Sequence, residues 1–88
     1  MAARRDLPAR YARFFRALGR QIRSYRKERH LSQENMVSYG FSLRHWQRIE
    51  AGRPITLSTL LRICSTLDLP PEQLVAGLSH HLRKGRKK

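Results

Sequence analysis

The 88-residue sequence has few cysteines, few acidic residues and no long apolar run, and these shortages exclude whole classes of protein. A single cysteine, Cys64, cannot form an internal disulfide, so we expect a reducing, cytoplasmic compartment rather than a disulfide-stabilised secreted domain. No stretch approaches the run of about 18 apolar residues that a membrane-spanning helix needs. The start of the sequence, with Arg4 and Arg5, lacks the apolar stretch of a signal peptide. We therefore expect neither secretion nor insertion into a membrane.

The residue groupings that catalysis and metal binding need are also missing. The four histidines and Cys64 show no zinc-ligand spacing. No pattern orders a serine or cysteine with a histidine and an acid into a nucleophile and its base. A chain of this length buries only about 60–65% of the surface that its unfolded form exposes, which leaves little room for a substrate pocket. The sequence therefore predicts neither an enzyme nor a bound metal or cofactor.

What the sequence has in excess is positive charge. Lysine and arginine number 19 against 6 acidic residues, a formal net charge of +13. Residues 1–29 hold ten basic residues against two acidic ones and residues 79–88 hold five against none, whereas residues 30–78 hold four of each. Such a surplus attracts phosphate or anionic lipid over a long range. The expected organisation is a basic N-terminal arm at 1–7, a folded domain at 8–77 and a basic C-terminal tail at 78–88.

A long amphipathic helix is predicted over about residues 8–29. Asp6 is placed to cap it and Pro8 to occupy its first turn. At about 100° per residue its apolar side chains fall on one stripe: Tyr11, Phe14, Phe15, Leu18, Ile22 and Tyr25. Gly19 lies inside the helix at a cost of about 1 kcal/mol relative to alanine, yet the stripe continues through it.

The opposite face of this helix is basic. It carries Arg10, Arg13, Arg16, Arg20, Arg23 and Lys27. Such a face fits three interpretations: a solvated surface, a phosphate-contacting flank or a membrane-surface helix. The aromatic stripe is longer than a small core can cover, so we expect Tyr11, Phe14 and Phe15 to pack against the tail, a partner protein or a second copy.

Two short helices follow, joined by a tight turn. Ser32 is placed to cap the first, which Gly40 ends, and Ser42 is placed to cap the second, which runs to Ala51. Gly52 suits the positive φ that closes a helix. Two short helices around a glycine turn form the outline of a helix-turn-helix.

Two further helices complete the predicted core. Thr56 begins one whose apolar residues recur at helical spacing and are expected to face inward: Leu57, Leu60, Leu61, Cys64 and Leu67. Its position on this stripe makes Cys64 a core residue rather than a reactive thiol. Asp68 and Pro70-Pro71 end this helix, and Pro71 opens a short one to Val75. The predicted fold class is all-α.

The sequence resembles the Cro/CI-type helix-turn-helix family (XRE family) of phage repressors and bacterial regulators in four runs: Leu31-Ser32-Gln33-Glu34, Gly40-Phe41-Ser42, Ile49-Glu50-Ala51-Gly52 and Thr56-Leu57. The resemblance covers about residues 18–74. It implies a five-helix bundle of the lambda-repressor-like type, here with an N-terminally extended first helix, that binds double-stranded DNA as a homodimer. Between Gln33 and Gly40 the chain is one residue shorter than the family pattern, so the second helix either ends early or tightens into a 3₁₀ turn.

The resemblance also implies roles for single residues of a recognition helix that runs from Ser42 to Ala51. The positions that read bases are Leu43, Arg44, Gln47 and Arg48. The positions that contact phosphate are Gln33, Ser42, His45 and Arg53. Arg26 and Glu50 match a partly buried ion pair, and Trp46 and Ile49 match inward positions. Arginine can bind O6 and N7 of guanine together but serves phosphate equally well, and Leu43 suits a thymine methyl group.

The function that these features favour is that of a repressor-like transcriptional regulator of the bacterial or phage nucleoid. One alternative is an antitoxin-type module, which binds DNA and also holds a partner protein on the face of Tyr11, Phe14 and Phe15. Another is a binder of any nucleic acid or of a membrane surface, with a steep dependence on salt and no preference for a site.

Overall fold

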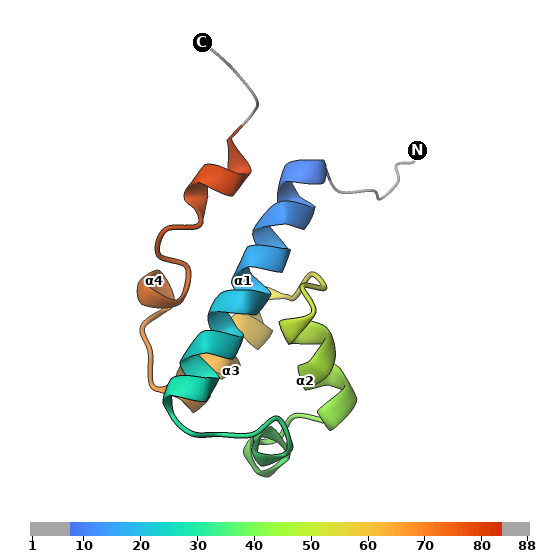
Figure 1. The fold of residues 1–88 in the computed structure, drawn as a ribbon, viewed down its shortest axis with the longest axis vertical. Helices are drawn as coiled ribbons and strands as arrows, with labels where there is room; N and C mark the ends of the chain where they lie inside the picture. Colours follow the sequence, from blue (N-terminus) through green and yellow to red (C-terminus); the bar gives the residue numbers. More distant parts are fainter. Residues whose placement is uncertain (1–7, 84–88) are drawn as a thin grey trace.

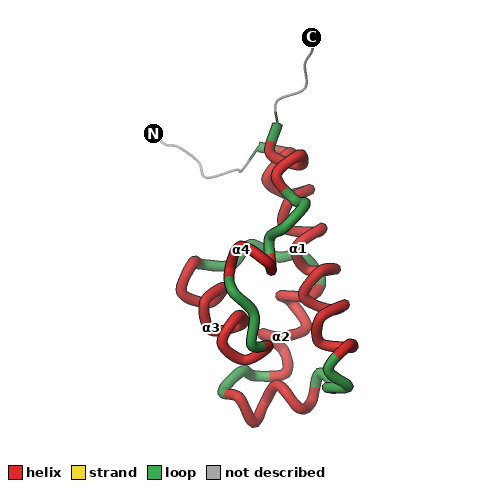
Figure 2. The backbone as a smooth tube through the Cα atoms, turned by 90° about the vertical axis from the view of Figure 1, so that its left-hand side faces the viewer, coloured by secondary structure: helices red, strands yellow, loops and turns green. Residues whose placement is uncertain are grey.

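A computed structural model describes residues 8–83 and contains only helices and connecting loops in that range (Figures 1 and 2). In chain order the helices are α1 (Ala9–Glu28), the 3₁₀ helix η1 (Glu34–Tyr39), α2 (Leu43–Glu50), α3 (Leu57–Leu67), α4 (Pro71–Leu74) and a second 3₁₀ helix, η2 (Ser79–Leu82). The all-α prediction is confirmed, with η1 and α1 to α4 as the five expected helices and η2 as an addition. The expected arm at 1–7, with the cap Asp6, and the last part of the tail, 84–88, lie outside the described residues.

Helix α1 is the long element along which the others are arranged (Figure 1). It is one residue shorter at each end than the predicted range 8–29, because Pro8, expected in the first turn, occupies the N-cap position and Arg29 the C-cap position. Leu18 and Ile22 are buried, as the predicted stripe requires, and so is Ala17, which the stripe omitted. Phe14 and Phe15 pack partly buried against the same core.

Two glycines allow α1 and α2 to touch backbone to backbone. A Cβ atom on Gly19 would lie 2.6 Å from the carbonyl oxygen of Glu50 and 2.8 Å from that of Ile49. A Cβ on Gly52, which has φ of +95°, would lie 2.8 Å from the Cα of Arg16. Gly19 therefore does more than weaken a helix, because no side chain fits where the end of α2 crosses α1.

The core lies between α1, α2 and α3. Its largest fully buried side chains are Trp46, Ile22, Met36, Ile49, Ile63, Leu67 and Leu74. Cys64 is buried too, and burial, with a smaller contribution from the charge of Glu72, raises the pKa of its thiol. A raised pKa disfavours the reactive thiolate, in agreement with a core role for Cys64.

The predicted inward stripe of α3 is wrong at two positions. Leu57 is 69% exposed and Leu61 is 47% exposed, whereas Ile63, which the stripe omitted, is fully buried. At about 100° per residue the apolar arc of α3 is wider than the core covers, and the core takes the side that holds Ile63, Cys64 and Leu67. Two leucines therefore remain at the surface.

The chain beyond α4 packs back onto α1. Leu78 is buried, and η2 contacts α1 beside its N-terminal half (Figures 1 and 2). Gln21 ties this region to α1, since its Nε2 donates to the carbonyl oxygens of Leu74 and Ala76, each at 2.9 Å. The chain after α4 thus covers part of α1.

The close crossing at Gly19 gives the first prediction. Gly19→Ala gains helix propensity of about 1 kcal/mol. The added methyl group must nevertheless push α2 away from α1, so we expect a net loss of about 1–3 kcal/mol in the free energy of unfolding, measured by urea titration. Ser24→Ala, at an exposed position of the same helix, is the control and changes stability by less than about 0.5 kcal/mol. A Gly19→Ala protein more stable than the wild type would contradict the crossing.

Candidate nucleic-acid interface

Helix α2 is the predicted recognition helix, and its ends are defined by local contacts. Ser42 caps it, with its Oγ accepting a hydrogen bond from the backbone N–H of His45 at 3.0 Å. Trp46 and Ile49 are buried and fasten one face to the core. The opposite face, which includes Arg44, is open to solvent.

The exposed face of α2 has a centre and two flanks. At about 100° per residue, Arg44 lies opposite the buried side. Gln47 and the half-buried Leu43 lie on the flank towards α1 and η1. Arg48 and His45 lie on the other flank, towards the loop that follows α2. The four positions expected to read bases therefore lie on one exposed face of α2 but point in different directions from the helix axis.

The flank with Arg48 borders a basic hollow. A surface pocket of about 260 Å³ is lined by His45, Arg48 and Arg53, with Ile49, Pro54 and Ile55 as its apolar wall. Three side chains able to carry positive charge thus line one concavity, and such groups form strong charge-assisted hydrogen bonds to phosphate. Arg48 is placed with the two residues expected to contact phosphate, and Arg44 is at the centre of the face.

The other flank borders a larger polar hollow between α1, η1 and α2. Its volume is about 520 Å³, and its lining includes Arg23, Ser32, Gln33 and Gln47. Gln33, expected to hold phosphate, is half-buried, and its Nε2 donates to Glu50 Oε1 at 2.9 Å. Its side chain therefore belongs to the protein's own hydrogen-bond network.

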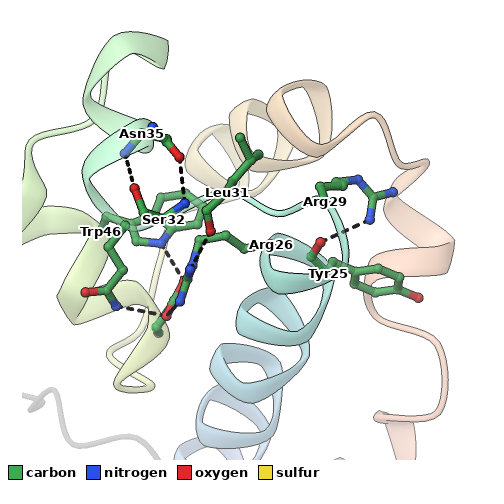
Figure 3. Close-up of polar contacts among 9 residues, drawn as sticks. Tyr25, Arg26, Arg29, Leu31, Ser32, Asn35 and Trp46 are labelled. Carbon is green, nitrogen blue, oxygen red and sulfur yellow. Dashed lines mark hydrogen bonds and ion pairs between the residues drawn. The ribbon is translucent and has the colours of Figure 1, made fainter.

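That network centres on the carboxylate of Glu50 at the end of α2, to which Arg26 and Trp46, both labelled in Figure 3, donate hydrogen bonds. Arg26 on α1 approaches it with two nitrogens, Nε at 2.5 Å and Nη2 at 3.0 Å. Trp46 Nε1 donates to it at 2.5 Å, in addition to Gln33. Arg26 also donates through Nη1 to the carbonyl oxygen of Leu31, at 2.7 Å. One carboxylate therefore joins α1, the start of η1 and α2.

The Arg26–Glu50 ion pair is buried, with side-chain exposures of 7% and 4%. Burial alone raises the pKa of Glu50, but the three donors and the positive charge of Arg26 outweigh it and leave the pKa below its ordinary value. The carboxylate stays ionised at neutral pH. Sequence reasoning placed Trp46 only in the core and missed its indole N–H as a donor; its position four residues before Glu50, one helical turn, was the available signal.

The turn between η1 and α2 is held by a residue that the sequence did not single out. Arg62 on α3 donates through Nη2 to the carbonyl oxygen of Gly40 at 3.0 Å, and its guanidinium lies 4.3 Å from the ring centroid of Phe41. Gly40 has φ of +96° and ends η1. No pattern in the sequence pairs a lone arginine of α3 with this turn, because the contact arises only from packing.

The segment between Gln33 and Gly40, which is one residue shorter than the family pattern, forms the 3₁₀ helix η1. It begins with a reciprocal pair, in which the Asn35 N–H donates to Ser32 Oγ at 3.0 Å and the Ser32 N–H donates to Asn35 Oδ1 at 2.7 Å. Of the two outcomes open from the sequence, the structure has the tightened helix.

Comparison with known proteins places this arrangement in a family. The sequence model of a family described as a helix-turn-helix domain matches residues 17–77, from the middle of α1 to beyond α4. No curated protein and no solved structure gives a significant match. No helix in the described part of the chain is long and apolar enough to cross a membrane.

The Glu50 carboxylate gives the second prediction. A carboxyl group whose pKa is lowered by folding adds stability above its ordinary pKa of 4.5, and this stability is lost as the pH falls through the lowered value. Glu50→Gln removes the charge and leaves Arg26 buried without its counter-ion, so we expect a loss of about 3 kcal/mol at pH 7. Urea titrations across pH should show the gap between wild type and variant narrowing in acid. Glu34→Gln, at an exposed acid on η1, is the control; an equal effect there would contradict the role of Glu50.

Proposed function

The chain belongs to the helix-turn-helix domain family, and we propose that it is a repressor-like transcriptional regulator that docks α2 in the major groove of double-stranded DNA. The observation that carries the proposal is the exposed face of α2, where Arg44, Gln47 and Arg48 are presented by a helix anchored through Trp46 and Ile49. The major groove, about 12 Å wide, admits one α-helix.

The two flanks of α2 suggest a division of work. Arg44, at the centre, is proposed to read guanine, with Gln47 and Leu43 reading the neighbouring bases. His45 and Arg53 are proposed to hold a backbone phosphate in their shared hollow, while Arg48, on its edge, reaches either a base or that phosphate. Ser42 and the backbone of Gln33 are proposed to add phosphate contacts at the helix starts.

This division gives the third prediction. Duplexes enriched by the wild-type protein from a random pool supply the specific site. Arg44→Ala should weaken binding to that site by about 1–3 kcal/mol, roughly tenfold to a hundredfold, and leave random duplex almost unaffected. Arg53→Ala is the matched comparison and should weaken both duplexes equally, with a salt slope lower by about 0.9. Fluorescence anisotropy at two salt concentrations measures both. Equal behaviour of the two variants would contradict the proposal, and so would a pool that yields no enriched site.

A homodimer is proposed because α3 carries an exposed leucine beside an apolar groove. The exposed Leu57 stands at the edge of an apolar groove of about 230 Å³. The groove is lined further by Phe14, Phe15, Leu18, Ile55, Thr56, Leu60 and Val75. A protruding leucine beside an apolar hollow can be exchanged across a two-fold axis, as an isologous interface requires. Such a dimer would read two half-sites about 34 Å apart.

The dimer gives the fourth prediction. Leu57→Glu places a charge at an exposed position, so it should spare the fold and shift the protein from dimer to monomer in sedimentation equilibrium, weakening binding to a two-half-site duplex at least tenfold. Ser58→Glu, the exposed neighbour, is the control and should remain dimeric. A wild-type protein that is monomeric even on DNA would contradict the homodimer and favour the antitoxin-type alternative, in which a partner protein occupies the groove.

A further inference from the structure

Positive charge gathers where η2 packs on α1, away from the recognition helix. We define the α1–η2 seam as Arg13 and Arg20 of α1 with His80 and His81 of η2. The two imidazole rings lie 3.9 Å apart, centroid to centroid. The sequence has no acidic residue between Leu7 and Lys27 and none after Glu72, so the stretches of α1 and η2 that form the seam contain no counter-charge; Glu28, the one acid of α1, lies at its far end.

The seam lies on a different side of α1 from α2. Arg16 meets α2 at Gly52, while Gln21 meets the segment between α4 and η2. Figure 1 accordingly shows α2 and η2 on opposite sides of α1. A straight duplex lying along the exposed face of α2 therefore has the body of α1 between it and η2.

The seam also falls largely outside the family domain. The match covers residues 17–77, which leaves out Arg13, His80 and His81. Helix η2 is nonetheless held against α1 by packing, through the buried Leu78 and the two hydrogen bonds of Gln21. The addition to the domain is thus an ordered basic surface built from two elements.

We propose that the α1–η2 seam is a second, sequence-independent DNA surface that holds the backbone phosphates of another duplex segment while α2 occupies the first. The proposal rests on the DNA binding proposed for α2, and it makes the protein a bridge between two segments. Phosphate fits because the surface offers guanidinium and imidazole donors at a spacing set by two packed helices, and a polyanion neutralises several of them at once.

The electrostatics of His81 agree with an anion site. Burial lowers the pKa of its imidazole, and the neighbouring positive charges lower it further, those of His80, Arg20 and Arg13. The charged groups that face it thus come from both helices and all have the same sign. A bound phosphate would oppose them, so random duplex should raise the pKa of His81 as followed by NMR.

The first experiment measures binding to a random-sequence duplex in solution, where α2 has no site to read. Arg13→Gln and Arg20→Gln should each weaken binding about threefold to tenfold at low salt and lower the salt slope by about 0.9. Lys27→Gln is the matched control, because it removes one charge from the same exposed face of α1 beyond the seam. Equal effects of all three substitutions would overturn the proposal, because binding would then depend on the overall positive charge of α1 and not on a site at the seam.

The second experiment tests bridging directly. Wild-type protein bound to an immobilised enriched duplex should capture a fluorescent random duplex. The Arg13→Gln/Arg20→Gln protein should remain bound to the immobilised duplex but capture at least 90% less of the random duplex. This is the loss expected when two phosphate contacts are removed. Undiminished capture by this variant would overturn the proposal. A failure of the function proposed for α2 gives a different result: no site is enriched from the random pool, while the random-duplex measurements still test the seam.

A membrane surface is the competing polyanion. Vesicles of phosphatidylglycerol and phosphatidylcholine, with phosphatidylcholine alone as the reference, provide the comparison. Seam substitutions that lower vesicle binding and leave duplex binding unchanged would overturn the DNA assignment. The DNA assignment is supported if the seam substitutions lower duplex binding and if the protein binds the phosphatidylglycerol vesicles no better than phosphatidylcholine vesicles alone.

Discussion

The buried carboxylate of Glu50 is the contact on which the rest of the structure depends. It receives hydrogen bonds from three other residues, Arg26, Gln33 and Trp46, and so links α1, the start of η1 and α2 at one point. Burying an ion pair is costly, and its best-supported benefit is that it selects one arrangement over others. Helix α2 has only eight residues and would not persist alone in water. Its position therefore depends on tertiary contacts: those of Glu50, the packing of Trp46 and Ile49 in the core, and the close crossing with α1 at Gly19.

The features predictable from the sequence are the local ones. The starts of α2 and α3 followed from Ser42 and Thr56, whose hydroxyl groups accept from backbone N–H groups three residues on. The angular order of Arg44, Gln47 and Arg48 followed from helical geometry alone. What could not be predicted depends on which elements meet. The reason for Gly19 lies on another helix, and the exposure of Leu57 depends on where the core ends. The hollow that joins Arg48 to Arg53 depends on the path of a loop, which no periodicity describes.

The distribution of charge acquires a physical meaning once the helices are placed. Residues 30–78 are neutral by count, but the Glu50 carboxylate is paired with Arg26 of α1. The exposed face of α2 therefore keeps a positive balance that the sequence count hides. That surplus is small next to the face of α1. Reading bases needs few, well-placed donors, whereas attraction to phosphate grows with the number of cations. In the proposed function, the few donors that read bases therefore lie on α2, whereas most of the cations lie on α1.

The N-terminal half of α1 shows why this separation can be rigid. An unsupported helix extension would fray, and its charges would behave as a loose tail. Here Phe14 and Phe15 pack against the core, Leu78 is buried, and Gln21 holds the chain after α4 through two carbonyl oxygens. The conformational entropy of these residues is therefore lost when the protein folds and not when it binds a partner. This lowers the entropic cost of binding and favours tight contact with a rigid partner such as a duplex. A basic surface built in this way acts at a fixed distance and direction from α2, which a flexible tail of equal charge does not.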